Sequence, residues 1–336
     1  MLQKIAVFDA KSYDEKVFDK VNEQFGFELI YHKEHLDINN VILASGCDAV
    51  CIFVNAVGDA AVIKRLKQLG IKLIALRCAG FNNVDIKAAT QEGITVVRVP
   101  DYSPHAIAEH TLALMLCLNR KVHRAFLRTR DGNFSLHGFL GFDMEGKTVG
   151  VIGTGRIGKT VIGILKGLGM RIMAYDLYPD HAYAEREGIT YAPLDDIYAQ
   201  ADIITLHCPL TKETEYLICD QSLAKMKDGV MIINTGRGKL INSKHLIDGL
   251  VSRKVGYAGL DVYEEEGNYF YEDRSDSVMT DEVLARLLSF NNVIITSHQA
   301  FFTQEAMSNI ANTTLNNIRS FFEGKELVNE VVYKVN

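Results

Sequence analysis

The sequence predicts an α/β protein with two doubly wound parallel sheets. Short apolar runs typical of buried strands alternate with helical segments along all 336 residues, the pattern of parallel sheets covered by helices on both faces. Gly26, Gly70 and Gly93 each stand where a predicted helix ends, a position that favours left-handed backbone. A chain of this length also exceeds what one compact core usually covers, which favours two domains.

The first domain should contain alternating strands and helices up to residue 100. We expect strands near Lys4–Phe8, Phe27–Tyr31, Ala49–Val54, Lys72–Leu76 and Thr95–Val97. Helices should lie between them, near Tyr13–Phe25, Ala60–Leu69 and Val84–Gln91. A long segment with an apolar stripe, residues 105–123, follows the break at Pro100 and Pro104 and should carry the chain into the second domain.

The second domain is expected to span residues 101–300, with strands at Thr148–Ile152 and again from Arg171, Ile203, Val230, Tyr257 and Val293. The final helix, residues 303–322, is too long for a tail and should return to the first domain. The first domain would then be discontinuous, residues 1–100 and 301–336. The cleft between the two domains is where we expect a second ligand.

One segment, residues 121–146, does not fit the alternation. It carries several basic residues and then the apolar side chains Phe134, Leu136, Phe139, Leu140 and Phe142. Our preferred interpretation is an arm that packs against another subunit, and docking on its own domain is the alternative.

The composition excludes several classes of protein. Hydrophobic content of 48% with 23% charged residues is typical of soluble globular proteins. A net charge of -6 without a basic cluster argues against nucleic acid as a partner. No apolar stretch approaches the length of a membrane span or resembles a signal peptide. Six scattered cysteines without paired metal spacing predict reduced thiols in a cytoplasmic protein, and no bound metal.

Residues 153–160 match two phosphate-binding patterns at once. Gly153, Gly155 and Gly158 form G-x-G-x-x-G, the turn that holds a dinucleotide pyrophosphate. Gly153, Gly158, Lys159 and Thr160 form G-x-x-x-x-G-K-T, the phosphate loop of ATPases and kinases. Both patterns join a strand to a helix whose N-terminus faces phosphate.

The surrounding sequence favours the dinucleotide. A second strand ends at Asp176, about twenty residues beyond the glycines, where an acid is expected to bind the ribose hydroxyls. Its charge would repel a 2′-phosphate, so NAD is favoured over NADP. The phosphate-loop reading needs an aspartate closing another apolar strand to hold magnesium, and Asp261, after a strand interrupted by Gly259, is the only candidate.

Three polar residues follow later strands, and their types suit reduction of a 2-oxo acid. Arg237 can bind a carboxylate with two hydrogen bonds, and His298 can exchange a proton with the carbonyl oxygen. A nearby Glu266 would hold the imidazole tautomer and favour its charged form. Taken singly, each has an ordinary explanation as a solvated charge or a loop hydrogen bond. Their shared position at the carboxyl edge of one sheet is what supports a catalytic role.

The tripeptide His207-Cys208-Pro209 ends another strand at that edge. It could contact the cofactor or cap the strand, and both interpretations stay open. Zinc at His207 and Cys208 is not expected, because no second pair of ligands stands at a suitable spacing.

Four motifs together resemble the NAD-dependent D-2-hydroxyacid dehydrogenases over nearly the whole chain. They are Gly153-Thr-Gly-Arg-Ile-Gly158, Asn234-Thr-Gly-Arg-Gly238, Leu260-Asp-Val-Tyr-Glu-Glu-Glu266 and Ser297-His-Gln-Ala300. Arg77-Cys-Ala-Gly-Phe-Asn-Asn-Val-Asp85 and Pro100-Asp-Tyr-Ser-Pro104 are most similar to members that form D-lactate in fermentation. The resemblance implies a Rossmann domain inserted in a flavodoxin-like substrate domain, reversible reduction of pyruvate by NADH, and a homodimer, or a tetramer, formed through the arm.

The resemblance also implies roles for individual residues. Arg237 would bind the substrate carboxylate, and His298 would be the acid/base paired with Glu266. Substrate contacts would come from Tyr102, the Ala79 and Gly80 backbone, and the pocket walls Phe53 and Phe301. The residues expected at the cofactor are Gly153, Gly155, Arg156, Ile157, Gly158, Asp176, His207, Cys208, Pro209, Thr235, Gly236 and Asp261. Asp261 would lie behind the site and would also affect how the activity depends on pH.

Two further functions remain open at this point. The same fold could reduce another 2-oxo acid, although bulky residues around a small pocket favour pyruvate. The alternative from a different class is an NAD-sensing binding protein, which would keep the same site without turnover. Glu266 counts against the related formate dehydrogenases, which lack an acid beside the histidine.

Overall fold

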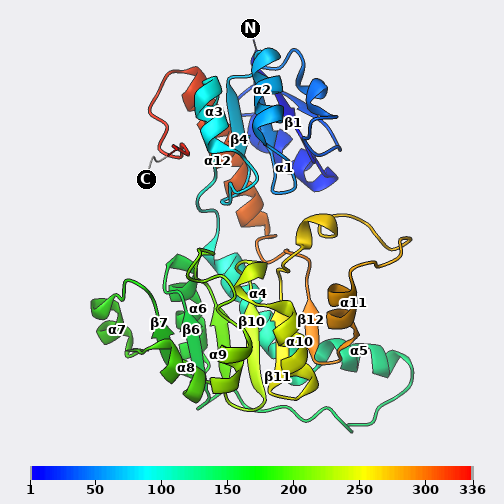
Figure 1. The fold of residues 1–336 in the computed structure, drawn as a ribbon, viewed down its shortest axis with the longest axis vertical. Helices are drawn as coiled ribbons and strands as arrows, with labels where there is room; N and C mark the ends of the chain where they lie inside the picture. Colours follow the sequence, from blue (N-terminus) through cyan, green and yellow to red (C-terminus); the bar gives the residue numbers. More distant parts are fainter. Residues whose placement is uncertain (1, 334–336) are drawn as a thin grey trace. The chain divides into compact units, whose positions relative to one another are not determined.

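The structure is a computed structural model that describes residues 2–333. The chain divides into two compact units. Unit 1 comprises Met1–Ser103 together with Phe302–Asn336, and unit 2 is the continuous segment Pro104–Phe301. Each unit is built around its own parallel sheet, so the predicted fold class is confirmed (Figure 1).

The sheet of unit 1 has five strands among the described residues, in the order β2-β1-β3-β4-β5. Every pairing is parallel. β3 and β4 are buried at every residue, as expected for strands covered on both faces, and this is why they appear in the sequence as unbroken apolar runs. The strands are β1 (Lys4–Val7), β2 (Glu28–Tyr31), β3 (Ala49–Ile52), β4 (Leu73–Leu76) and β5 (Thr95–Val97).

The helices of unit 1 that follow Asp59 and Asp85 begin at residues whose side chains cap them. The Asp59 carboxylate accepts a hydrogen bond from the Val62 N–H at 2.9 Å, and the Asp85 carboxylate accepts one from Ala88 at 2.9 Å. The third helix ends at Gly93 with φ 66°, the left-handed conformation that its sequence position predicted. The helices are α1 (Ser12–Asn22), η1 (Val41–Ala44), α2 (Ala60–Gln68), α3 (Ile86–Glu92) and α12 (Gln304–Phe322).

Helix α12 completes the core of unit 1 although it lies some two hundred residues beyond the rest of that unit. Its buried face carries Ala311, Leu315 and Ile318, which pack with residues of α1 and of the strands, such as Phe18 and Ile5. Figure 1 shows α12 beside α1 and β4. The amino-terminal part of unit 1 therefore depends on the end of the chain for part of its hydrophobic burial.

The sheet of unit 2 has seven parallel strands in the described chain, in the order β12-β11-β10-β9-β6-β7-β8. The chain enters at β6, runs outward to β8, and then returns to the other side of β6 with β9, so the strand order reverses between β6 and β9. The strands are β6 (Thr148–Ile152), β7 (Arg171–Tyr175), β8 (Thr190–Tyr191), β9 (Ile203–Leu206), β10 (Val230–Asn234), β11 (Val255–Leu260) and β12 (Val293–Ile295).

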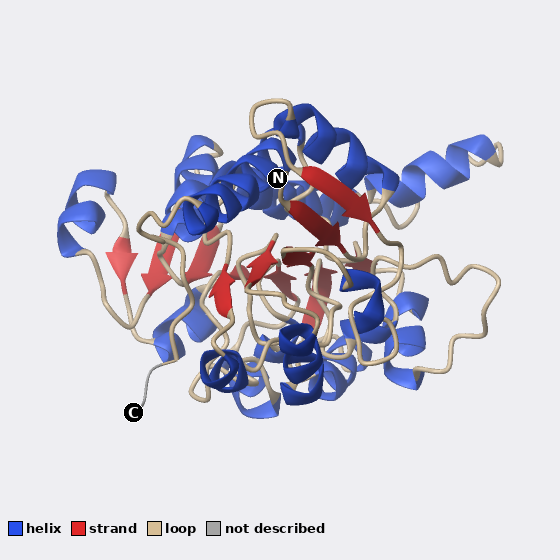
Figure 2. Ribbon diagram, turned by 90° about the horizontal axis from the view of Figure 1, so that it is seen from above, coloured by secondary structure: helices blue, strands red, loops and turns tan. Residues whose placement is uncertain are grey.

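Alternate residues of these strands supply two separate cores. Ile203, Met231 and Ile233 belong to the cluster on one face, whereas Ile204 and Ile232 belong to the cluster on the other. Helices cover both faces of the sheet (Figure 2). Apart from α5, which is described below, the helical segments of unit 2 are α4 (Pro104–Arg120), α6 (Arg156–Gly167), α7 (His181–Glu187), α8 (Leu194–Gln200), α9 (Asp220–Lys225), η2 (Gly238–Leu240), α10 (Ser243–Val251), η3 (Glu266–Asn268) and α11 (Glu282–Ser289).

The helix predicted over residues 105–123 is interrupted. α4 ends at Arg120, Lys121 adopts a left-handed conformation with φ 51°, and a further helix, α5 (Val122–Arg130), begins after it. The Lys121 ammonium donates to the Leu140 carbonyl at 2.7 Å and holds the following segment near this break. In this segment Phe134, Leu136 and Leu140 are 77–90% exposed. Among residues 2–333, no helix combines the length and apolarity needed to cross a bilayer.

Leu315→Ala tests how far unit 1 depends on its last helix. Leu315 is fully buried, so this change should lower the free energy of unfolding by about 2–5 kcal/mol. Urea denaturation combined with amide exchange in β1 and β4 measures the effect. Asn316→Ala, at an exposed position of the same helix, is the control and should change stability by less than about 0.5 kcal/mol. Equal stability of the two variants would contradict this account of the core.

Candidate active site

The residues singled out in unit 2 follow the carboxyl ends of its parallel strands. The glycine turn follows β6, Asp176 follows β7, and His207 follows β9. Arg237, Glu266 and His298 follow β10, β11 and β12. Because all seven strands run in the same direction, these loops share one edge of the sheet, next to the reversal of strand order between β6 and β9.

The glycine turn is tightly packed on its protein side and open at its centre. Gly153 has φ 96°, and a Cβ there would lie 2.5 Å from the Cys208 nitrogen. A Cβ on Gly158 would lie 2.0 Å from the Gly153 carbonyl oxygen, so glycine is required for the helix to approach the strand. A Cβ on Gly155 meets no atom within 4 Å. The open side at Gly155, at the N-terminus of α6, fits a pyrophosphate.

Asp176 is held in place by the same turn. Its Oδ2 accepts the Thr154 N–H at 2.7 Å and the Thr154 hydroxyl at 3.0 Å, and its Oδ1 accepts the Tyr178 N–H at 3.0 Å. Partial burial acts to raise the pKa of this carboxyl, but these hydrogen bonds outweigh it and the net pKa is lowered. Asp176 is therefore a fixed negative charge beside the turn, as a ribose-binding acid must be.

The phosphate-loop alternative does not fit the contacts of its own key residues. The Lys159 ammonium binds the Asp180 carboxylate at 2.6 Å, and the Thr160 hydroxyl donates to the Arg156 carbonyl inside α6 at 2.9 Å. A phosphate loop needs this lysine on the phosphates and this hydroxyl on magnesium. Here the first pairs with the N-cap of α7 and the second is used within its own helix.

His207 and Cys208 form an uncharged part of the same edge. The His207 Nε2 lies 2.9 Å from the Thr205 hydroxyl, and burial lowers the pKa of the imidazole to about 4. Burial also raises the pKa of the Cys208 thiol to about 11. Both side chains are therefore neutral at physiological pH, and they add no charge beside a negatively charged dinucleotide.

The loop that carries Arg237 is shaped by Asn234. The buried Asn234 side chain accepts the Gly236 N–H at 3.0 Å and donates to the Arg237 carbonyl at 2.9 Å. A Cβ on Gly238 would lie 2.1 Å from the Tyr263 carbonyl, so this loop packs directly on the loop after β11. The half-exposed Arg237 guanidinium donates one hydrogen bond to the Gly236 carbonyl at 2.8 Å and retains further N–H groups for an anion.

Glu266 and His298 meet although they are 32 residues apart. The His298 Nδ1 lies 2.8 Å from Glu266 Oε1, and both side chains are at least three-quarters buried. A carboxylate only accepts hydrogen bonds, so Nδ1 carries the proton in this contact. The neighbouring Glu264 has other partners, the Ser243 N–H at 2.6 Å and the Tyr216 hydroxyl at 2.9 Å. Of the three successive glutamates, Glu266 is thus the one that orients the histidine.

Asp261 supports the histidine loop from behind. Its side chain is 0% exposed, and the carboxylate accepts the Thr296 hydroxyl at 2.6 Å and the N–H groups of Gln299 and Ala300 at 2.8 and 2.9 Å. The sequence suggested contact with the cofactor, whereas the structure directs this carboxylate to the loop of its own sheet. The structure therefore favours a supporting role for Asp261.

Helix α4 also reaches this edge, which no sequence pattern indicated. The His110 Nε2 lies 3.0 Å from the Thr296 hydroxyl, and the Thr111 and Thr235 hydroxyls are 3.0 Å apart. A single histidine and a single threonine inside an apolar helix match no functional motif, so sequence alone did not single them out.

The substrate residues predicted in unit 1 are described within that unit. Phe53 follows β3 and is 7% exposed, with the Arg77 guanidinium 4.4 Å from its ring centroid. Ala79 and Gly80 are half-buried and follow β4, and the Tyr102 carbonyl accepts a hydrogen bond from Asn309 in α12 at 2.7 Å. Phe301 is half-buried at the end of unit 2. Their roles toward a substrate stay predictions.

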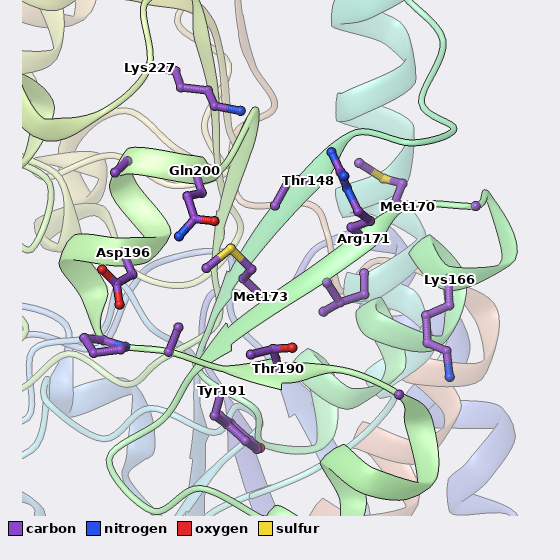
Figure 3. Close-up of a pocket in the computed structure, with 16 residues that line it drawn as sticks. Thr148, Lys166, Met170, Arg171, Met173, Thr190, Tyr191, Asp196, Gln200 and Lys227 are labelled. Carbon is purple, nitrogen blue, oxygen red and sulfur yellow. The ribbon is translucent and has the colours of Figure 1, made fainter.

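A large groove in unit 2 lies elsewhere. Figure 3 shows this groove of about 980 Å³, lined by residues at the amino ends of β6 and β7 and by residues in and around β8 and on α8. The amino ends of β6 and β7 are opposite to the loops described above. Its lysines are already paired, Lys166 with Glu187 at 2.8 Å and Lys227 with Asp202 at 2.9 Å. The groove is therefore not the candidate active site.

The doubly wound sheet, the glycine turn with its acid, and the histidine–glutamate pair define a dinucleotide-dependent oxidoreductase. Residues 112–300 match the family described as D-isomer specific 2-hydroxyacid dehydrogenase, NAD binding domain. The chain belongs to this family, as its motifs predicted, and its cofactor is NAD.

Individual proteins match over nearly the full length. A 2-hydroxyacid dehydrogenase homolog of Haemophilus influenzae is 52% identical, with 98% of this chain and 99% of that protein covered. D-lactate dehydrogenase of Escherichia coli is 50% identical over 98% of this chain and all of that protein, and its apo structure matches with a TM-score of 0.91. A structure of the pyruvate reductase of Chlamydomonas reinhardtii matches with a TM-score of 0.93, 43% identity and 98% coverage of both chains.

Lys159→Ala separates the two interpretations of the glycine-rich turn. Because Lys159 pairs with Asp180 at a partly exposed site, we expect NADH affinity within about twofold of the wild type. Gly158→Ala, whose Cβ would clash with Gly153, should weaken NADH binding by at least about tenfold. The change in intrinsic NADH fluorescence on titration with the protein measures both affinities. Binding of ATP with magnesium that disappears in Lys159→Ala would instead restore the phosphate-loop interpretation.

Proposed function

We propose that this protein is a D-lactate dehydrogenase, which reduces pyruvate to D-lactate with NADH and catalyses the reverse reaction. The contact between His298 Nδ1 and Glu266, on the sheet edge that also carries Arg237 and the glycine turn, is the observation that carries the proposal. The names of the relatives from Escherichia coli and Chlamydomonas reinhardtii support the same reaction.

Each of the three residues has a distinct task in this proposal. NAD supplies the hydride chemistry when it is bound. Arg237 binds the carboxylate of the 2-oxo acid with its forked N–H groups and polarises the neighbouring ketone. Because Nδ1 of His298 faces Glu266, Nε2 is the nitrogen that gives a proton to the ketone oxygen. Glu266 fixes the orientation of the ring and its tautomer.

The cofactor residues divide by the part of NAD that they would hold. The open turn at Gly155, with Arg156, Ile157 and the α6 N-terminus, would bind the pyrophosphate. Asp176 would accept hydrogen bonds from the ribose hydroxyls. The neutral residues His207 to Pro209, together with Thr235 and Gly236, would line the remaining surface of the cofactor.

Unit 1 would act as the substrate domain and unit 2 as the cofactor domain. Following the family resemblance, the Tyr102 hydroxyl and the Ala79 and Gly80 N–H groups would bind the substrate carboxylate. Phe53 and Phe301 would limit the side chain that the site accepts. The Arg77 guanidinium over the Phe53 ring supports a rigid wall, which suits a substrate as small as pyruvate.

The biological setting is also part of the proposal. We infer a cytoplasmic enzyme that works in fermentation, where pyruvate reduction regenerates NAD⁺. The exposed apolar side chains of the arm, residues 121–146, support a homodimer formed through this segment, because patches of this kind mark protein interfaces.

The loss of NADH absorbance with pyruvate, glyoxylate, 2-oxoisocaproate and 2-oxoglutarate tests the proposal directly. We expect pyruvate to have the highest kcat/KM and its product to be D-lactate. Preference for another acid would keep the reaction class and change the substrate. Tight NADH binding with no turnover of any of them would favour a sensing protein.

Arg237→Ala should lower kcat/KM for pyruvate at least about a hundredfold, since two charge-assisted hydrogen bonds of about 1.5–3 kcal/mol each are lost. NADH affinity should stay within about twofold. Arg237→Lys keeps the charge but not the forked geometry and should recover only part of the loss. Arg286→Ala, on the exposed face of α11, is the control. Full activity of Arg237→Ala would refute the assignment.

Glu266→Gln should lower kcat for pyruvate at neutral pH by about 10–100-fold. The amide keeps the size of the side chain but can turn its NH2 group toward Nδ1, so it no longer fixes the ring with the proton on that nitrogen. NADH affinity should stay within about twofold. Steady-state kinetics measure the effect, with the exposed neighbour Glu265→Gln as control. Equal kcat values in the two variants would mean that the pair does not act together.

A further inference from the structure

Helix α4 contacts both loops that carry the proposed catalytic residues. At consecutive positions, His110 touches Thr296 at the base of the His298 loop, and Thr111 touches Thr235 at the base of the Arg237 loop. Both contacts lie within unit 2, between α4 and the carboxyl ends of β10 and β12.

We propose that His110 is a positioning residue for His298, which it holds in place through Thr296 and Asp261. This inference rests on the proposed function for the role of His298, but the chain of contacts behind it does not. His110 would support His298 in addition to the contact with Glu266, and it comes from a distant part of the sequence.

The number of protons on Thr296 determines which group donates in each of these hydrogen bonds. Thr296 has one hydroxyl proton, and the 2.6 Å contact with the Asp261 carboxylate, which only accepts, uses it. The His110 Nε2, 3.0 Å from the same hydroxyl oxygen, must therefore be the donor. Nε2 also lies 3.5 Å from Asp261 Oδ1. His110 thus donates a hydrogen bond to Thr296, and Thr296 donates one to Asp261.

Asp261 connects Thr296 to the loop that carries His298. Its two oxygens accept the N–H groups of Gln299 and Ala300, and its carbonyl accepts the His298 N–H. A fully buried carboxylate must be satisfied by such donors, because it cannot turn to water. Without the His110 N–H, the Thr296 hydroxyl is no longer held in the orientation that donates to Asp261. The carboxylate would then reorient and release one or both amides.

The loop needs this support because its backbone is unfavourable. Ser297 and His298 both have φ 52°, a left-handed conformation that costs non-glycine residues about 1–3 kcal/mol each. Such residues keep this conformation only where their surroundings impose it. If the loop relaxed, the His298 ring would leave the 2.8 Å contact with Glu266, which depends on the direction in which the backbone projects the side chain.

The environment of His110 is consistent with a fixed neutral donor. Its side chain is 19% exposed and that of Asp261 is 0% exposed. Burial lowers the pKa of His110, and the Asp261 charge opposes that effect without reversing it. A neutral imidazole with its proton on Nε2 can make the contact without placing a second charge in the core.

The test compares three variants of the full-length protein. His110→Leu removes the donor, His110→Gln keeps an N–H group near the position of Nε2, and Met115→Leu is a packing control at a buried position of the same helix. The readouts are kcat and KM for pyruvate, NADH affinity, and amide exchange of the ligand-free protein followed by mass spectrometry over residues 295–302.

For His110→Leu we expect kcat to fall at least about tenfold with NADH affinity within about twofold, because the proton donor and not the cofactor site is displaced. Exchange over residues 295–302 should become at least about tenfold faster as the Gln299 and Ala300 amides open. His110→Gln should restore kcat to within about threefold of the wild type. Met115→Leu should change neither kcat nor the exchange over residues 295–302.

Three results would overturn the proposal. They are a kcat of His110→Leu within twofold of the wild type, an equal loss in His110→Gln, or faster exchange spread over all of unit 2, which would indicate general destabilisation. A wild-type protein that does not reduce pyruvate would refute the proposed function alone, because exchange over residues 295–302 would still report on His110.

Discussion

The buried carboxylate of Asp261 is the constraint on which the geometry of the site depends. It is fully enclosed, so each of its oxygens must be satisfied by the protein, and the donors available are the Thr296 hydroxyl and two amides of the histidine loop. Leaving this charge without partners costs several kcal/mol, which offsets the about 1–3 kcal/mol for each of the two left-handed residues Ser297 and His298. The loop conformation is therefore a consequence of the charge beneath it.

The parallel sheet explains why such distant residues can act together. Strands that run in one direction place all their following loops on one edge, and the reversal of order between β6 and β9 opens space for the dinucleotide there. The glycine turn, Asp176, Arg237, Glu266 and His298 come from five different loops of this edge. Because His207 is neutral, it adds no positive charge to this edge of the sheet.

Much of this architecture could be predicted because its causes are local in the sequence. Buried strands appear as unbroken apolar runs, and Gly153 and Gly158 are required by close contacts within the turn. The break at Lys121 escaped prediction because the apolar period continues across it. The three successive glutamates look alike in composition and periodicity, and it was the family motif that singled out Glu266. The tertiary contacts give Glu264 other partners and bring Glu266 to His298. His110 could not be recognised, since its meaning depends on a helix and two strands that meet from 150 residues or more away.

The return of α12 to unit 1 has a consequence for synthesis on the ribosome. Unit 2 is one continuous segment and has all its residues once Phe301 has emerged. Unit 1 begins first but lacks a wall of its core until the last helix is made. Its strands remain partly uncovered while two hundred further residues are translated at about 5–20 per second. The unit whose strands are translated before unit 2 is thus the last to be finished. For about ten to forty seconds it is the unit most exposed to aggregation and to chaperones.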